Sequence, residues 1–91
     1  MSTRKVPRPF EFHWGKGWVI EEASVTTPYH EPTIQLLVYE SGEKSIRFCG
    51  YDERGRMGRY PLLIGEEHLG ALGKQVKKNP RLSKLLKKLV A

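Results

Sequence analysis

The chain of 91 residues has one cysteine, no long apolar run and no acidic side chain among its last 18 residues. The single cysteine, Cys49, excludes an intrachain disulfide and fits a reducing compartment. No apolar run exceeds about four residues, whereas a membrane-spanning helix needs roughly 20. The first residues also lack the apolar stretch of a secretory signal peptide. We therefore expect an intracellular protein with no membrane partner, in the cytoplasm or nucleoid, or in the nucleus if the source is eukaryotic.

Patterns that carry catalysis or bind cofactors are also missing. The histidines His13, His30 and His68 are scattered, and Cys49 would pair with His68 as a nucleophile only by a coincidence of folding. Zinc needs about four converging ligands, usually in close sequence pairs, and no such spacing occurs. The Gly15-Lys16-Gly17 segment lacks the downstream glycine and helix of a dinucleotide-binding loop. We expect no enzyme, no metal site and no cofactor.

Positive charge is concentrated at the C-terminal end. Residues 74–91 hold seven Lys or Arg and no acid, whereas residues 1–73 hold nine basic and ten acidic side chains. The whole net charge of +6 therefore comes from the last 18 residues. Such a basic segment on a near-neutral body usually indicates a polyanionic partner or an acidic membrane surface.

Hydrophobic periodicity separates a sheet from a helical part. Residues 1–9 have no periodicity and are expected to form a flexible basic arm. Aromatic and β-branched runs predict strands at residues 10–14, 18–25, 33–40, 45–51 and 56–64. Gly15-Lys16-Gly17 is expected to be a turn or bulge and Ser41-Gly42 a hairpin turn. Residues 65–91 show helical periodicity with a kink or break at Pro80.

These elements predict an α+β fold with a single domain over residues 10–91. An antiparallel meander of four to five strands would occupy residues 10–64, and helices over residues 65–91 would pack on one face of it. Alternation places Ile34, Leu36 and Val38 on the helix side, together with Ile46 and Phe48. Residues 10–25 either extend this sheet or form a separate hairpin.

The opposite face of the predicted sheet interleaves aromatic rings with guanidinium groups. Unstacked bases need flat surfaces and phosphates need cations, so this pattern favours single-stranded nucleic acid. An ordinary solvated face with cross-strand aromatic pairs is the alternative. The candidate binding residues are Tyr39, Arg47, Tyr51, Arg54, Arg56, Arg59, Trp14, Trp18 and Lys44. The two tryptophans could instead belong to the core, and the turn arginines Arg54 and Arg56 could simply be solvated.

The C-terminal helix has three competing interpretations. Its cations could neutralise phosphates, its leucine stripe could pack in the core, a dimer or a partner protein, or the whole segment could lie on a membrane surface. Leucines at helical spacing are usually packing contacts, which favours the second interpretation for Leu82, Leu85, Leu86 and Leu89. The auxiliary basic residues are Lys74, Lys77, Lys78, Arg81, Lys84 and Lys88.

Residues 33–78 resemble the core of the positive-cofactor-four type transcriptional coactivators, and the Pur-alpha and Whirly types are similar in plan. The matching positions are Ile46, Phe48, Tyr51, Gly58, Arg59, Leu69 and Leu72, while Cys49 stands where that family has an arginine. The resemblance implies a curved antiparallel meander followed by one helix, a homodimer, and single-stranded DNA on the sheet.

Two functions from different classes remain open. The first is a sequence-tolerant single-stranded DNA-binding protein, associated with transcription or replication, for which RNA is a possible alternative ligand. The second is a protein-interaction module that docks through the basic amphipathic helix onto a transcription or replication protein.

Overall fold

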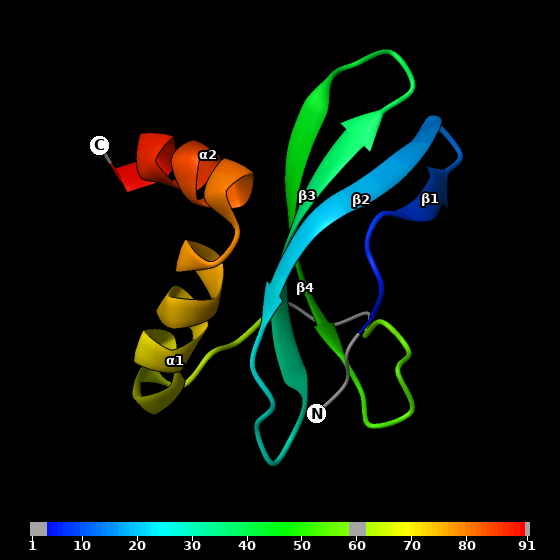
Figure 1. The fold of residues 1–91 in the computed structure, drawn as a ribbon. Helices are drawn as coiled ribbons and strands as arrows, with labels where there is room; N and C mark the ends of the chain where they lie inside the picture. Colours follow the sequence, from blue (N-terminus) through cyan, green and yellow to red (C-terminus); the bar gives the residue numbers. More distant parts are fainter. Residues whose placement is uncertain (1–3, 59–61, 91) are drawn as a thin grey trace.

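A computed structural model describes residues 4–58 and 62–90 of the chain. They form one antiparallel sheet in the order β1-β2-β3-β4, and both helices lie on the same side of it (Figure 1). The expected α+β fold is confirmed, and the first hairpin extends the sheet because β2 pairs with β3. The elements are β1 (Arg8–Phe12), β2 (Gly15–Ser24), β3 (Glu31–Tyr39), β4 (Lys44–Tyr51), α1 (Glu66–Lys77) and α2 (Pro80–Val90).

The turn between β1 and β2 is not where the glycines predicted it. Phe12 pairs with Gly15, so the connection is the two-residue turn His13-Trp14 and both glycines belong to β2. Position 17 requires glycine because β3 approaches closely, so that a Cβ at this position would overlap the carbonyl oxygen of Val38. The Ser41-Gly42 hairpin turn is confirmed, with Gly42 at a φ of 91° that favours glycine.

The strand predicted at residues 56–64 is wrong for the part that the structure describes. After β4, Met57 makes only an isolated bridge to Tyr51, and residues 62–65 belong to no strand. The chain turns because the Asp52 carboxylate accepts the backbone N–H groups of Arg54 and Arg56. Residues 59–61, which include Arg59, lie outside the described residues.

The main core lies between the sheet and the two helices. Leu36 and Leu82 are fully buried and pack with Ala23, Ile34 and Leu72. The predicted helix-facing side of β3 and β4 is confirmed for Ile34, Leu36 and Ile46, which packs at the edge of this cluster. Phe48 shares that side but remains about half exposed. The helices therefore cover only part of the face.

A bulge in β2 fixes the start of α2. The register passes from Val19 opposite Leu37 to Glu21 opposite Leu36, which leaves one extra residue between them. Glu21 then reaches the helix layer and accepts the backbone N–H of Leu82 at 2.8 Å. A carboxylate at this position binds a backbone N–H that has no partner within the helix, and it is stabilised by the positive end of the helix dipole.

The chain changes direction between the two helices. The Asn79 amide donates to the Gln75 carbonyl at 2.9 Å and so closes the end of α1. α1 ends at Lys77, and Pro80 is the first residue of α2, a position where its missing N–H costs nothing. Of the helices that the described residues form, none is long and apolar enough to cross a membrane.

Candidate nucleic-acid interface

Arg47 and Tyr51 do share one face of the sheet, as predicted, but Tyr51, at the end of β4, is covered. Gln35 pairs with Arg47 and Glu31 with Tyr51 on the side of the sheet opposite the helices. Tyr51 is only 7% exposed, because the Arg4 guanidinium lies 3.8 Å from the centre of its ring. Tyr51 therefore stacks on a cation of its own chain and offers no open surface to a base.

A carboxylate at the centre of this face binds several of the nearby polar groups. Glu22 accepts hydrogen bonds from Arg4 Nε at 3.3 Å, from Arg8 Nη2 at 2.6 Å and from Gln35 Nε2 at 2.6 Å. The Gln35 oxygen in turn accepts Arg47 Nε at 2.6 Å. Residues 1–9 were expected to form a flexible basic arm. Among the residues of this segment that the structure describes, Arg4 pairs with Glu22 on the sheet and Arg8 is the first residue of β1.

The pKa directions of these groups follow from the same contacts. Burial by itself would raise the pKa of Glu22, but hydrogen bonds from Arg8 and Gln35 and the charge of Arg4 hold it below its ordinary value. Burial would lower the pKa of Arg4 and of Arg8, but their carboxylate partners raise both. The second carboxylate is Glu31, whose oxygens accept hydrogen bonds from Arg4 Nη1 and Nη2, both at 3.2 Å. Arg4 and Arg8 are thus matched by Glu22 and Glu31, and the face has little positive charge left for phosphates.

Aromatic side chains gather at the other end of this face. Phe12 stacks on Trp14 with ring centres 4.6 Å apart, and the Arg47 guanidinium lies 5.5 Å from the Phe12 ring. Tyr39 contacts the same group edge-on through Phe10. The structure thus brings Tyr39, Arg47 and Trp14 together around two phenylalanines that the candidate list omitted. The alternation of positions 10 and 12 in β1 is the signal that could have identified them.

Trp14 is 66% exposed, but its surroundings do not favour phosphates. The hollow beside it is lined by Glu40 and Glu43 as well as by Lys16. Acidic side chains that line the same hollow repel a polyanion. This end of the sheet therefore has aromatic area without surplus positive charge.

The turn arginines lie at the far end of β4 from Lys44, about 23 Å away along the strand at roughly 3.3 Å per residue. Arg56 Nε lies 3.5 Å from the Asp52 carboxylate, on the surface. Hydrogen bonds from the backbone N–H groups of Arg56 and Arg54 lower the pKa of Asp52. Arg54 lines one hollow with Tyr51, so the turn arginines are remote from Lys44 but not from Tyr51, and Arg56 already has an acidic partner.

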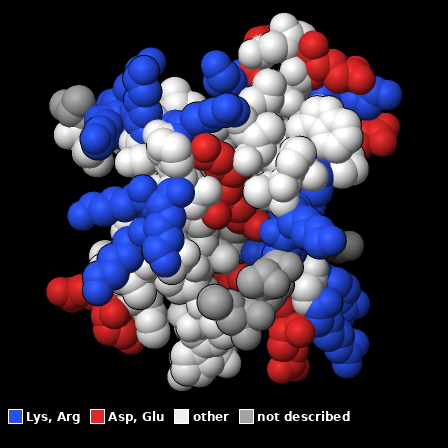
Figure 2. All heavy atoms as spheres, in the orientation of Figure 1, with Lys and Arg blue, Asp and Glu red and all other residues white. Residues whose placement is uncertain are grey.

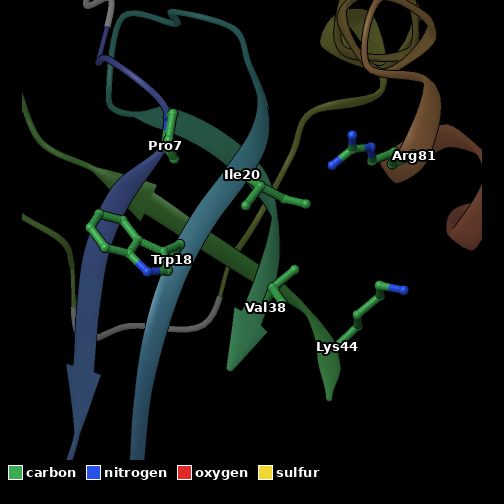
Figure 3. A pocket seen from close by; sticks show the side chains of 6 residues that line it. All are labelled: Pro7, Trp18, Ile20, Val38, Lys44 and Arg81. Atoms are coloured by element: carbon green, nitrogen blue, oxygen red, sulfur yellow. The ribbon is translucent and has the colours of Figure 1, made fainter. Parts of the chain in front are cut away.

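Three predicted residues meet on the helix side instead. One row of side-chain positions crosses all four strands, pairing Pro9 with Trp18, Trp18 with Val38, and Val38 with Lys44. This row lies beyond the part of the sheet that the core cluster covers. It forms one wall of a groove of about 570 Å³ whose lining residues are Pro7, Trp18, Ile20, Val38, Lys44 and Arg81 (Figure 3).

The groove combines an aromatic ring with two cations. Trp18 is 51% exposed, and Figure 3 shows Arg81 reaching from the start of α2 toward Ile20. Lys44 and Arg81 form no ion pair within residues 4–58 and 62–90. The sequence predicted Trp18 and Lys44 as binding residues and Arg81 as an auxiliary basic residue of the C-terminal helix. It missed that they line one groove, together with three apolar residues.

The helices extend this positive surface. Figure 2 shows Lys and Arg side chains gathered over the helical side of the molecule. The exposed cations there are Lys74, Lys77, Lys78, Arg81, Lys84, Lys87 and Lys88. The leucine stripe packs against the core through Leu82, Leu85 and Leu86, whereas Leu89 is exposed. In the described ranges no three His, Cys, Asp or Glu side chains come together to hold a metal ion.

No protein family, curated protein or solved structure matches the chain.

Proposed function

We propose that this protein is a sequence-tolerant single-stranded DNA-binding protein that acts inside the cell in transcription or replication. The observation that carries the proposal is the surplus of exposed cations on the helices, which adjoin a groove with an exposed tryptophan. Cations attract the phosphate backbone regardless of sequence. An aromatic ring beside them gives a surface for an unpaired base.

The proposal moves the interface from the predicted sheet face to the helix side. On the sheet face, Arg4 and Arg8 are neutralised by Glu22 and Glu31, and Tyr51 is buried under Arg4. On the helix side, the chain has no acidic residue after Glu67. Net attraction for a polyanion is therefore concentrated around α1, α2 and the groove.

The test is a salt-series titration with labelled oligonucleotides of one sequence, as a single strand and as a duplex. We expect tighter binding to the single strand, and log affinity falling with log salt by about 0.7 for each phosphate neutralised. Replacing Lys84 and Lys88 with Gln should weaken binding and flatten the slope. The matched control replaces Arg54 and Arg56 with Gln, which removes the same charge at a remote turn. Equal affinity for both forms, or no binding at low salt, would overturn the proposal.

The proposal includes a homodimer. Two exposed apolar side chains support it, since Phe48 on β4 is 48% exposed and Leu69 on α1 is 51% exposed. Sedimentation equilibrium over a range of concentrations tests this part separately. A monomer at every concentration would remove the dimer and leave the binding proposal intact.

A protein-interaction module is the second candidate, and the end of α2 favours it. Leu89 is 71% and Val90 83% exposed, and neither is used by the core. Apolar docking of this helix end on a transcription or replication protein would survive high salt, which strips phosphate contacts. Replacing Leu89 with Ser should abolish a salt-resistant partner complex without changing oligonucleotide affinity.

A further inference from the structure

We infer that the groove between β2 and α2 holds one unstacked nucleotide of a DNA single strand, with its base against Trp18 and its phosphates along Lys44 and Arg81. The inference rests on the proposed function and names the place where that function reads a base. The groove volume of about 570 Å³ falls in the range of about 300–1,000 Å³ that small-molecule sites occupy.

The arrangement of the lining matches the two ends of a nucleotide. In Figure 3, Trp18 lies toward β1, whereas Arg81 and Lys44 lie toward α2. Ile20 and Val38 lie between them and give an apolar floor. A base packed on Trp18 would thus direct its sugar and phosphates toward the two cations.

Both halves of the site are held by the fold. Trp18 is flanked in its row by Pro9 and Val38 on the neighbouring strands. Arg81 lies next to Leu82, whose backbone N–H is bound by Glu21 and whose side chain is fully buried. The separation of the two backbone positions is therefore set by β2 and by the start of α2. This preorganisation reduces the entropy lost when a strand binds.

The chemistry of the lining side chains decides what the site reads. Pro7, Ile20 and Val38 are apolar, and the polar groups of Trp18, Lys44 and Arg81 can only donate hydrogen bonds. None of the lining side chains accepts a hydrogen bond, so the proton of a 2′-hydroxyl finds no side-chain partner, and its oxygen would only compete for donors that the phosphates also use. The site therefore gives ribose no advantage and is complete with deoxyribose. Base edges are read only weakly, which gives sequence tolerance. A base inside a duplex keeps both faces stacked and has none to offer Trp18.

The first experiment compares the two exposed tryptophans. Trp18→Leu should weaken the binding of a thymidine single strand of about 12 nucleotides by about 5- to 150-fold, the range that stacking of a base on an aromatic side chain gives. Trp14→Leu is the matched control, because Trp14 is also exposed but lies beside two acidic residues, and it should change affinity less than twofold. Trp18→Phe keeps a smaller ring and should fall between these values.

Two further measurements do not depend on removing Trp18. In a Trp14→Phe protein the remaining tryptophan fluorescence comes from Trp18, and it should be quenched when the strand binds. Arg81→Gln and Lys44→Gln should each lower the salt slope by about 0.7, the value for one phosphate contact. An RNA strand of the same bases should bind no more tightly than the DNA strand.

The outcomes separate the two proposals. If the unaltered protein binds no oligonucleotide at low salt, the proposed function fails, and the inference fails with it. If the protein binds but Trp18→Leu has no effect and Trp18 is not quenched, the groove inference is overturned while the function stands. Tighter binding of RNA that is lost in Trp18→Leu would overturn the assignment of deoxyribose.

Discussion

Replacing Glu22 with Gln should destabilise the protein more than any other single change of a surface or sheet-face charge. The Glu22 side chain is 7% exposed and pairs with Arg4 and Arg8, which are 15% and 24% exposed. Removing one partner of a buried ion pair costs about 3–5 kcal/mol. Both arginines keep some contact with water, and a glutamine oxygen still accepts one hydrogen bond. We therefore expect a loss of about 2–3 kcal/mol in the free energy of unfolding.

This loss is large for a domain of this size. Domains of about 100 residues have unfolding free energies of roughly 5–15 kcal/mol, and each 1 kcal/mol shifts the melting temperature by about 4–8 °C. Urea unfolding followed by circular dichroism should show the full loss in the free energy of unfolding. Thermal unfolding should show a melting temperature about 10–20 °C lower. The matched control is Glu11→Gln, which removes the same charge from an exposed position in β1.

The pH dependence gives an independent check with a defined sign. The pKa of Glu22 is lowered in the folded protein from its ordinary value of 4.5. Its contribution to stability is therefore complete above about pH 4.5 and is lost as the pH falls through the lowered value. Glu22→Gln should lose stability less steeply over that acid range than the unaltered protein. A loss below about 1 kcal/mol at neutral pH, or an equal loss in Glu11→Gln, would refute this view of the sheet face.

Three other experiments test the packing. Leu82→Ala should cost about 2–5 kcal/mol because Leu82 is fully buried, whereas Leu89→Ala at the exposed end of α2 should stay within about 0.5 kcal/mol in urea unfolding. Gly17→Ala should abolish folding or shift the β2–β3 register, since its Cβ would meet the backbone of β3. The control Gly70→Ala adds a Cβ in open space and should raise the free energy of unfolding by up to about 1 kcal/mol. A stable Gly17→Ala protein would contradict the register. Burial raises the pKa of the Cys49 thiol, so a thiol reagent at neutral pH should label Cys49 only in denaturant. Rapid labelling of the folded protein would contradict the buried placement of Cys49.

Local patterns were sufficient where local chemistry decides the conformation. The hairpin at Ser41-Gly42 was predictable because a glycine at positive φ between two alternating strands has few other uses. Ile34 and Leu36 were assigned to the helix side by their period of two. The glycines at 15 and 17 were misread as a turn, because the reason for Gly17 is the close approach of β3, a neighbour distant in sequence.

The strand expected at residues 56–64 failed for a similar reason. Its apolar residues resemble a strand, and the turn at Asp52 does bring the chain back beside β4. The pairing there is limited to the bridge between Met57 and Tyr51, with a hydrogen bond from the Gly58 N–H to the Gly50 carbonyl. Leu62 and Ile64 then lead to the helix layer, and Ile64 packs against the core there. An apolar segment is equally consistent with a strand and with a connection that crosses the core edge. Only the packed structure distinguishes them.

The candidate site was predictable as a set of residue types and not as a surface. The sequence indicated that aromatic rings and arginines alternate on one face, and the register confirms that Arg47 and Tyr51 share it. It did not indicate that Arg4 and Glu22 would bind there and compensate the charge. Partner choice among ion pairs depends on distances across the fold, which alternation within one strand does not contain.

By itself the sequence determined the α+β class, the sheet-then-helix order and the excess of positive charge in the last 18 residues, because periodicity and charge are properties of neighbours along the chain. The tertiary structure alone decided which cations are neutralised and which remain available. It paired Arg4 and Arg8 with Glu22 and Glu31, and it placed Arg81 across one groove from Trp18, 63 positions away in the sequence. Charges interact through space and are weakened by burial and pairing, so the available positive surface follows from packing and not from the order of the residues.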